Sequence, residues 1–377
     1  MYLFLYPYPC QNFHPAFGGC NEKKLVIDGK EIPFTGNSIT YSPEEIHLWS
    51  ADDPYLYDFK IIAGKDSVSS YFALRFVTIE GKKILINGEP VFFHGLLDQG
   101  YFSDGIYLPA TYKGFENDIL TMKSLGFNCL RKHIKIEPQI FYYLCDKYGM
   151  YVFQDFVNNG KYSFIVDTAL PTIGFKRGIT HRADNIRRRH FEDTAKRTVN
   201  HLYNHPCVCY YTIFNEGWGQ YDADSQYDLF KKIDSSRVWD TTSGWFKETK
   251  SDVDSEHIYF KPLHFPASGS SSRPLVLSEF GGYSLKIPEN SANPNNTYGY
   301  KFFTEADDFC TAISKLYTEE VAEAIRSDHL CAAILTQVSD VEDETNGLFT
   351  YDRQVLKVDK ELMQRISKEI NTAFTMR

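Results

Sequence analysis

The alternation of apolar and polar residues changes near residue 79 of this 377-residue chain. Before that point, short alternating runs at residues 24–28, 57–63 and 68–77 are separated by glycine-containing turns. Short strands at this spacing are typical of an antiparallel β-sandwich. Because so short a segment is small for a complete sandwich, we expect residues 1–78 to form a partial one that lacks its first strands.

Beyond residue 79, apolar strands alternate with amphipathic helices. A hairpin pattern at residues 83–93 turns at Asn87-Gly88. Apolar strand patterns follow at residues 91–97, 127–133, 150–156, 208–214, 237–242, 256–260, 275–278 and 331–338. Helical patterns occur at residues 112–125, 139–148, 185–203, 224–233, 306–327 and 360–373.

This alternation predicts a parallel sheet, and its repeat number predicts a closed (β/α)8 barrel, the TIM barrel, over residues 79–377. A doubly wound open sheet is the alternative fold. The first strand–helix turn lacks the Gly-x-Gly-x-x-Gly pattern of a dinucleotide-binding sheet, and this absence favours the barrel.

Composition and charge narrow the classes of molecule that this chain is expected to bind. The formal net charge of −9 disfavours nucleic acid as a ligand, and no apolar run reaches the ~18 residues of a membrane-spanning helix. The apolar start at residues 1–9 lacks the features of a signal peptide, and the 8 cysteines include no Cys-x-x-Cys pair. We therefore expect a reduced, cytoplasmic protein without metal or cofactor. The sequence does not decide between a monomer and a homo-oligomer.

Polar and aromatic side chains stand at the ends of the predicted barrel strands, where the chemistry of such barrels lies. Two glutamates directly follow apolar strands: Glu216, which is preceded by Asn215, and Glu279. The other strand ends carry Asp98, Arg131, His133, Asp155, Trp245, His257 and Tyr259. A carboxylate in such a position must be solvated, paired or used in chemistry. The gathering of polar and aromatic residues at the strand ends therefore predicts an active site.

A pair of carboxyl groups suggests glycoside hydrolysis, which needs a proton donor on one side of the anomeric carbon and an ionised carboxylate on the other. Two nearby carboxylates push their pKa values apart, and Arg131 would keep one of them charged. Asn215 can hydrogen-bond a sugar 2-hydroxyl. Trp218 or Trp245 can form an apolar platform for a sugar ring, with core packing as the equal alternative for each.

Longer motifs extend the pattern along nearly the whole chain: LWSADDPYLY (48–57), INGEPVF (86–92), GFNCLR (126–131), FYYLCDKYG (141–149), NHP (204–206), NE (215–216) and SEFG (278–281). In order and spacing these motifs resemble glycoside hydrolase family 2, which contains β-galactosidases, β-glucuronidases and β-mannosidases. The resemblance implies a carbohydrate substrate, Glu216 as acid/base and Glu279 as nucleophile of a retaining mechanism. It also implies carboxyl groups ~5–5.5 Å apart, with the higher pKa on Glu216. Because a tyrosine at the position of Tyr259 commonly contacts the nucleophile in this family, we favour a site role for Tyr259 and His257 over core packing.

Two motifs depart from the family pattern, and these departures leave the identity of the substrate sugar open. Arg131 is followed by Lys132-His133-Ile134-Lys135 rather than the Ser-His-Tyr-Pro of many β-galactosidases and β-glucuronidases. Residues 152–156 (VFQDF) are nearer the β-mannosidase pattern. By family frequency we take an exo-acting β-galactosidase as the default, with β-mannosidase or β-glucuronidase activity as the alternative.

Other interpretations compete with an active glycosidase. Residues 1–78 resemble the tail of the family's immunoglobulin-like domain, and the jelly roll that normally precedes it is not found, so a truncated, catalytically silent carbohydrate-binding scaffold is the second hypothesis. A phosphate-binding barrel enzyme is the third, but Glu279 before Gly281-Gly282 would repel phosphate. We interpret the acidic run at residues 340–344 as a solvated loop, and residues 158–182 as a loop over the barrel mouth.

Overall fold

The computed structural model describes residues 2–5, 11–14, 22–157, 163, 165, 170, 184–259, 261–265 and 271–377. Its central sheet is made of eight parallel strands: β11 (Phe93–Asp98), β12 (Cys129–Lys132), β13 (Tyr151–Asp155), β14 (Val208–Asn215), β15 (Val238–Ser243), β16 (Asp254–Ile258), β17 (Leu275–Gly281) and β20 (Leu330–Thr336). Their spatial order is β15-β14-β13-β12-β11-β20-β17-β16.

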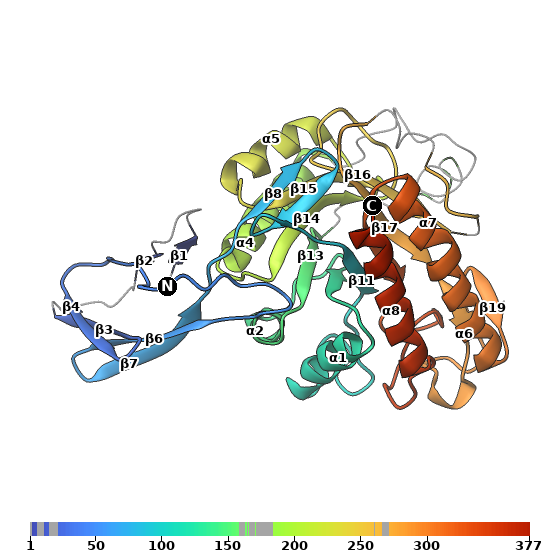
Figure 1. Cartoon of the computed structure of the whole chain (residues 1–377), viewed down its shortest axis with the longest axis horizontal. Helices are drawn as coiled ribbons and strands as arrows, with labels where there is room; N and C mark the ends of the chain where they lie inside the picture. Colours follow the sequence, from blue (N-terminus) through green and yellow to red (C-terminus); the bar gives the residue numbers. More distant parts are fainter. Residues whose placement is uncertain are drawn as a thin grey trace.

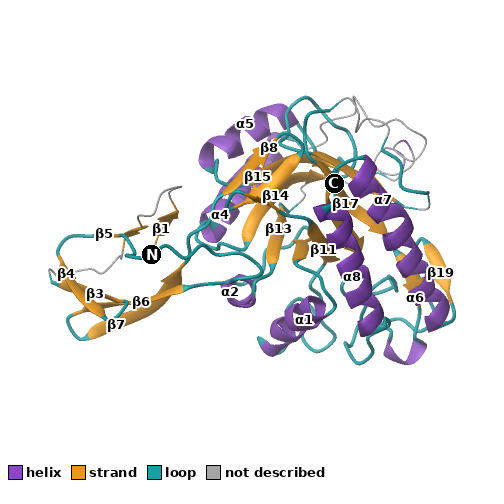
Figure 2. Ribbon diagram, viewed as in Figure 1, coloured by secondary structure: helices purple, strands orange, loops and turns teal. Residues whose placement is uncertain are grey.

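Helices cover the outside of this sheet, as Figures 1 and 2 show. They are α1 (Lys113–Ser124), α2 (Gln139–Tyr148), α4 (Asn185–Leu202), α5 (Ala223–Ile233), α6 (Ala306–Lys315), α7 (Ala322–Ser327) and α8 (Lys360–Thr375). Every residue of β11, β14, β17 and β20 is buried, as expected for strands that pack on both faces. The predicted TIM barrel is therefore confirmed.

The barrel closes between β15 and β16, which lie side by side without a backbone ladder. Side chains bridge this seam instead: Ser255 Oγ donates to Asp240 Oδ1 at 2.9 Å, and Ser243 Oγ lies 3.0 Å from His257 Nε2. The connection between the two strands, residues 244–253, contains no helix. The seam closes the sheet, so the doubly wound open sheet is wrong.

A small antiparallel sheet lies at the N-terminal ends of the barrel strands. It contains β8 (Val77–Glu80), β9 (Lys83–Ile86) and β10 (Glu89–Pro90), with the predicted turn at Asn87-Gly88. The turn between β8 and β9 reaches the start of β20, where the Cys331 thiol donates to the carbonyl oxygen of Lys82 at 3.0 Å. The opposite, C-terminal end of the barrel is left for the site.

Two further antiparallel sheets precede the barrel and project from one side of it (Figure 1). One has the order β4-β3-β6-β7 and the other β1-β2-β5; their strands are β1 (Tyr2–Leu5), β2 (Gln11–His14), β3 (Lys23–Ile27), β4 (Lys30–Phe34), β5 (Ile39–Tyr41), β6 (Tyr57–Ala63) and β7 (Asp66–Phe72). Buried and exposed positions alternate along β3 and β6, as in strands with one solvated face. Tyr71 Oη donates to Asp146 Oδ2 at 2.7 Å, and Trp49 Nε1 donates to the Asp146 carbonyl at 2.8 Å, which ties this part to α2.

Several predicted elements differ in detail. The helix expected at 306–327 is interrupted by a π-helical stretch, Leu316–Val321, and the sixth strand begins at Asp254 rather than residue 256. Residues between β17 and α6 form an unexpected pair of short strands, β18 (Tyr283–Leu285) and β19 (Lys301–Phe303), and a short 3₁₀ helix, Pro288–Asn290. Most of the loop expected at 158–182 lies outside the described residues.

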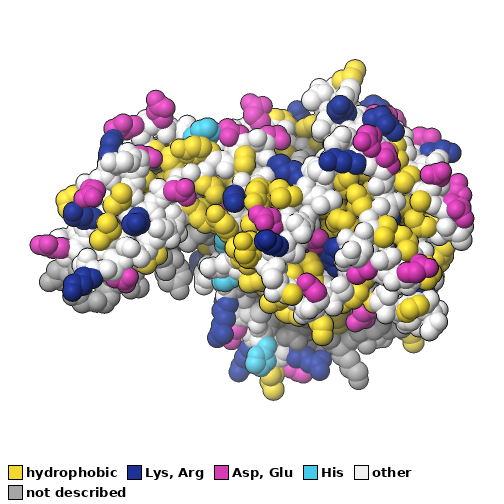
Figure 3. Space-filling model, turned by 90° about the horizontal axis from the view of Figure 1, so that it is seen from below, with side chains coloured by type: hydrophobic (Ala, Val, Ile, Leu, Met, Phe, Trp, Pro, Cys, Tyr) yellow, Lys and Arg dark blue, Asp and Glu magenta, His cyan; other side chains and the backbone are white. Residues whose placement is uncertain are grey.

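Two further features are the distribution of charged side chains on the surface and the character of the helices. On the face seen in Figure 3, basic and acidic side chains are interspersed rather than gathered by sign. Among the described residues, no helix combines the length and the apolar character needed to cross a membrane.

Candidate active site

Glu216 directly follows β14, at a sharp turn of the backbone. Its φ is +53°, and its amide donates to the carbonyl oxygen of Ser243 at 3.0 Å. Gly217 comes next with φ of +73°, and a Cβ there would lie 2.0 Å from Phe246, so the turn requires glycine. The turn leaves the Glu216 carboxyl at the strand ends with 29% of its side chain exposed.

Glu279 lies within β17 and is 7% exposed in its side chain. Both of its oxygens are held: Tyr259 Oη donates to Oε2 at 2.7 Å, and Arg131 Nη1 donates to Oε1 at 3.0 Å. Tyr259 in turn contacts Thr336 Oγ1 at 2.9 Å, at the end of β20. Hydrogen bonds from Tyr259, which follows the neighbouring strand β16, and from Arg131 on β12 therefore fix the orientation of this carboxylate.

Arg131 connects three strand ends from a fully buried position on β12. Besides Glu279, its guanidinium donates to Asp155 Oδ1 at 3.0 Å, to Asn215 Oδ1 at 2.8 Å and to the Ser278 carbonyl at 2.9 Å. Burial lowers the pKa of Arg131, but the charges of Asp155 and Glu279 outweigh burial and raise it. The planar guanidinium, with its fixed donor directions, thus arranges two carboxylates and the Asn215 amide around one charge.

His257 lies between the two glutamates. Its Nδ1 is 2.8 Å from Glu216 Oε1 and 3.5 Å from Glu279 Oε2. One carboxylate oxygen of Glu216 lies within 4.8 Å of one of Glu279. Retaining glycosidases place their two carboxyl groups ~5–5.5 Å apart, whereas inverting enzymes leave ~6.5–9.5 Å for a water molecule. The close approach of these oxygens fits the shorter, retaining arrangement.

Burial shifts the pKa values of Glu216 and His257, the two groups beside Glu279, in opposite directions. Burial raises the pKa of Glu216 to about 7, against the opposing charges of His133 and Arg131. Burial also lowers the pKa of His257 to about 4, so this histidine is neutral at neutral pH. Glu216 can therefore carry a proton near neutral pH, beside an uncharged imidazole.

His133 and Asp155 form a second pair on the same side of the pocket. His133 Nδ1 lies 3.0 Å from Asp155 Oδ2 and 4.0 Å from Glu279 Oε1. Burial alone would raise the pKa of Asp155, but the Arg131 charge lowers it. Burial alone would lower the pKa of His133, but the hydrogen bond that its ring donates to Asp155 and the charge of Glu279 raise it. When His133 is protonated, its positive charge lies 4.0 Å from Glu279, and the ionised Asp155 balances it.

The two tryptophans lie at the edge of this network rather than in the core. Trp218 follows the Glu216 turn, and its amide donates to the Asn215 carbonyl at 3.1 Å. The Trp245 ring lies 6.3 Å from the His257 ring, centroid to centroid. Both residues are partly exposed.

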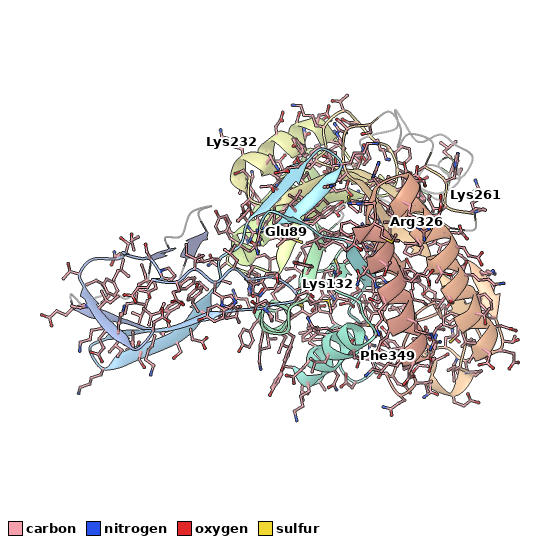
Figure 4. All side chains as sticks on the ribbon, viewed as in Figure 1. Glu89, Lys132, Lys232, Lys261, Arg326 and Phe349 are labelled. Atoms are coloured by element: carbon pink, nitrogen blue, oxygen red, sulfur yellow. The ribbon has the colours of Figure 1, made fainter. Side chains whose placement is uncertain are left out.

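Asp98 requires a correction, because the structure does not bring it into the pocket. Asp98 pairs in register with Lys132, and its Oδ2 accepts a hydrogen bond from Lys132 Nζ at 3.0 Å. Successive residues of a strand face opposite sides of the sheet, so Lys132 and Asp98 face away from the side that Arg131 occupies. Figure 4 labels Lys132 in the interior, whereas Lys232 lies at the periphery. Asp98 therefore belongs to a buried ion pair outside the barrel lumen.

Three further residues contribute to the site. Ser243 contacts His257, Thr336 contacts Tyr259, and the Tyr300 ring stacks on Tyr259 with centroids 4.0 Å apart. Ser243 and Thr336 end their strands, so the rule that located the glutamates also applies to them. Tyr300 comes from the unexpected segment before β19, and no periodic pattern marks it.

The acidic run at 340–344 also requires a correction. Asp340 is buried and forms an ion pair with Lys357 at 2.5 Å. Glu344 is half-buried and accepts hydrogen bonds from two glutamine amides. Only Glu342 among these residues is fully exposed, so the run is not simply a solvated loop.

A metal ion between the glutamates is disfavoured by charge. Glu216, His257 and Glu279 each offer a ligand atom close to the others, and they are the cluster of this kind found in the described part of the chain. The buried Arg131 guanidinium, however, already lies 3.0 Å from Glu279. A divalent cation would have to share that carboxylate with a permanent positive charge.

Two neighbouring carboxyl groups at the strand ends of a (β/α)8 barrel are the arrangement that glycoside hydrolysis requires. Residues 77–371 match the family described as glycosyl hydrolases family 2, TIM barrel domain, and the chain belongs to this family.

Curated relatives are β-galactosidases of greater length. The β-galactosidase large subunit of Lactobacillus acidophilus is 25% identical over 260 residues, which are 64% of this chain and 38% of that protein. The β-galactosidase of Leuconostoc mesenteroides is 28% identical over 198 residues, 50% of this chain and 18% of that protein. The chain thus spans well under half the length of these relatives.

Solved structures with this fold include enzymes for acidic sugars. The β-D-glucuronidase of Dictyoglomus thermophilum superposes with a TM-score of 0.72 at 18% identity, over 97% of this chain and 67% of that chain. A family 2 β-galacturonidase from Eisenbergiella tayi gives a TM-score of 0.61 at 18% identity, over 96% of this chain and 68% of that chain. At this identity the likeness concerns the fold.

Proposed function

We propose that this chain is a retaining β-glycosidase that removes a terminal sugar, with Glu279 as nucleophile and Glu216 as acid/base. The observation that carries the proposal is the pair itself: two carboxyl oxygens within 4.8 Å, one carboxyl held by Arg131 and Tyr259, the other with a pKa raised to about 7. Burial thus allows Glu216 to hold the proton that it donates, while hydrogen bonds from Arg131 and Tyr259 orient Glu279 as the nucleophile.

In the first step a Glu279 oxygen attacks the anomeric carbon, and the bond from that carbon to the leaving oxygen breaks. Glu216 gives its proton to the leaving oxygen, so a glycosyl ester on Glu279 and a free alcohol are formed. In the second step Glu216, now ionised, removes a proton from water as the water oxygen attacks the anomeric carbon. Glu279 leaves as a carboxylate, and the sugar keeps its β configuration.

Neighbouring residues have supporting roles in this proposal. Asn215 Oδ1 accepts from Arg131, so the orientation of the Asn215 amide is fixed and its NH₂ group can donate to the sugar 2-hydroxyl. Arg131 and Tyr259 hold Glu279 before and after it carries the sugar. Trp218 and Trp245 offer ring faces at the edge of the pocket, where a sugar can stack.

A β-galactoside is our first candidate substrate. It is supported by the curated relatives, which are β-galactosidases, whereas the β-glucuronidases and β-galacturonidase among the solved structures share the fold at lower identity. β-Mannosidase and β-glucuronidase activities remain the alternatives to be tested.

The test is hydrolysis of nitrophenyl β-galactoside, β-glucuronide, β-mannoside and β-glucoside by the whole chain. We expect turnover of the galactoside, and a loss of at least ~10³-fold in Glu279→Gln, because the nucleophile is removed while the shape of the side chain is kept. A folded protein that hydrolyses none of these glycosides would overturn the proposal and favour a silent carbohydrate-binding scaffold.

A further inference from the structure

Glu344 is a third carboxylate at the C-terminal end of the barrel, in the segment after β20. Gln337 Nε2 donates to Glu344 Oε2 at 2.8 Å, and Gln99 Nε2 donates to the same oxygen at 3.0 Å. Gln99 follows the last residue of β11, and Gln337 follows the last residue of β20. Two neighbouring strand ends therefore hold one oxygen of Glu344.

The same contacts place Glu344 beside the catalytic pair. Gln337 directly follows Thr336, whose hydroxyl contacts the Tyr259 hydroxyl that binds Glu279. Burial raises the pKa of Glu344, the positive charge of His133 lowers it, and the negative charge of Glu279 raises it. Glu344 is thus close enough to His133 and Glu279 for their charges to act on its carboxyl group.

Strand order shows which part of a substrate Glu344 would face. Between β14, which leads into Glu216, and β20, which leads to Glu344, lie β13, β12 and β11 in one direction and β15, β16 and β17 in the other. The two glutamates therefore come from opposite sides of the barrel. Because Glu216 must meet the leaving oxygen, the retained sugar extends toward the opposite side, where Glu344 lies.

We infer that Glu344 determines specificity for the retained sugar: it accepts a hydrogen bond from a neutral sugar hydroxyl and excludes sugars that carry a carboxylate. This inference rests on the proposed function. Within the described residues, Glu344 Oε2 receives both glutamine amides, whereas Oε1 has no recorded protein partner and the side chain is partly exposed. That oxygen is suited to a hydroxyl donor.

The chemistry of exclusion follows from the same contacts. A uronic acid would bring a further carboxylate next to Glu279 and Glu344, and like charges at short distance disfavour binding. The Nε2 groups of Gln99 and Gln337 both bind Glu344, and Gln337 Nε2 also donates to Asn346 Oδ1 at 2.8 Å. Both amides therefore already donate to protein acceptors and are not available to hydrogen-bond a uronate.

The matched substrates for the test are nitrophenyl β-galactoside and nitrophenyl β-galacturonide, which differ only in a hydroxymethyl group against a carboxylate. We expect kcat/KM of the wild type to favour the galactoside by ~100-fold or more. Glu344→Gln should lower that ratio by ~10-fold or more, since it removes the negative charge and keeps the size. Glu342→Gln, an exposed neighbour on the same segment, should leave the ratio unchanged.

An unchanged ratio in Glu344→Gln, or a wild type that prefers the galacturonide, overturns the inference and leaves the proposed function standing. If Glu344→Gln does not fold, inhibition of the wild type by galactose and by galacturonate gives the same comparison, with weaker inhibition by galacturonate expected. If the folded wild type hydrolyses no glycoside, the proposed function fails. Calorimetric titration with galactose and galacturonate then decides the inference, and equal or tighter binding of galacturonate overturns it.

Discussion

Arg131 Nη1 lies 3.0 Å from Glu279 Oε1, and the arginine that makes this contact is fully buried. The same guanidinium reaches Asp155 and Asn215, so a single cation organises an anion, an amide and the proposed nucleophile. Burying a charge is costly unless it is paired, and here each nitrogen of the guanidinium donates to a partner. The site is therefore arranged before a substrate arrives.

Arg131→Lys should impair both catalysis and stability. A lysine keeps the charge but has one nitrogen, which cannot reach Asp155, Asn215 and Glu279 at once. We expect kcat/KM to fall by ~10²-fold and the free energy of unfolding to fall by about 3 kcal/mol, measured by nitrophenyl-glycoside kinetics and urea denaturation.

Arg188→Lys is the control for this change. Arg188 pairs with Asp222 at 2.8 Å on the surface, where an ion pair contributes at most ~1 kcal/mol. If the two variants lose the same activity and stability, Arg131 does not have the organising role assigned to it.

The activity should fall on the alkaline side with a pKa near 7. Glu216 must be protonated to donate to the leaving oxygen, and burial raises its pKa to about 7. We therefore expect kcat/KM to decline about tenfold per pH unit well above that value, measured with a nitrophenyl glycoside over pH 5–9. In Glu216→Gln this alkaline limb should disappear, and a limb that persists in the variant would assign it to another group.

The same pKa shift predicts a pH-dependent effect on stability. A carboxyl with a raised folded-state pKa favours the folded state at low pH, and the ionised form then loses this advantage as the pH rises from the ordinary value of 4.5 through about 7. Glu216→Gln should therefore be more stable than the wild type at pH 8, by ~1–2 kcal/mol after allowance for the partial exposure of the side chain. The difference in melting temperature at pH 8 and pH 4.5 measures it, and a variant less stable at pH 8 would contradict the shift.

Sequence patterns were sufficient for the architecture, and they singled out two glutamates that the structure brings close together. Apolar runs that end in polar residues marked all eight barrel strands, because a strand buried on both faces leaves little choice of side chain until it reaches the barrel rim. Glu216 and Glu279 were recognisable because a carboxylate after such a run is costly without a use. The same rule also marks Ser243 and Thr336.

Sequence patterns failed where the direction of a side chain or an irregular segment decides the outcome. Asp98 ends its strand as Arg131 nearly ends its own, but the two point to opposite faces, and a shift of one residue is enough to change the face. Glu344 and Tyr300 lie in irregular segments, where no period relates sequence to position. The acidic run at 340–344 resembled a solvated loop because its partners are not next to it in the sequence. Lys357, which pairs with Asp340, lies beyond the run, and Gln99, which binds Glu344, follows β11.

Tyr259→Phe tests the hydrogen bond to Glu279 by removing one oxygen atom. The Tyr259 hydroxyl lies 2.7 Å from Glu279 Oε2, where in the proposed mechanism it positions the nucleophile and stabilises the carboxylate when it leaves. We expect kcat to fall by ~10–100-fold with KM changed less than threefold. Tyr211→Phe is the control, since the Tyr211 hydroxyl is buried without a hydrogen-bond partner in the described structure, and its removal should leave kcat unchanged.

The most direct test of the central claim is mass spectrometry of the protein after reaction with dinitrophenyl 2-deoxy-2-fluoro-β-galactoside. The fluorine slows both steps and the good leaving group restores the first, so a glycosyl–enzyme ester accumulates in a double displacement. The account predicts a mass increase of one fluorosugar, located on the peptide that contains Glu279 and absent in Glu279→Gln. A label on Glu216 or another residue, or turnover of ordinary substrates to the α anomer, would contradict it.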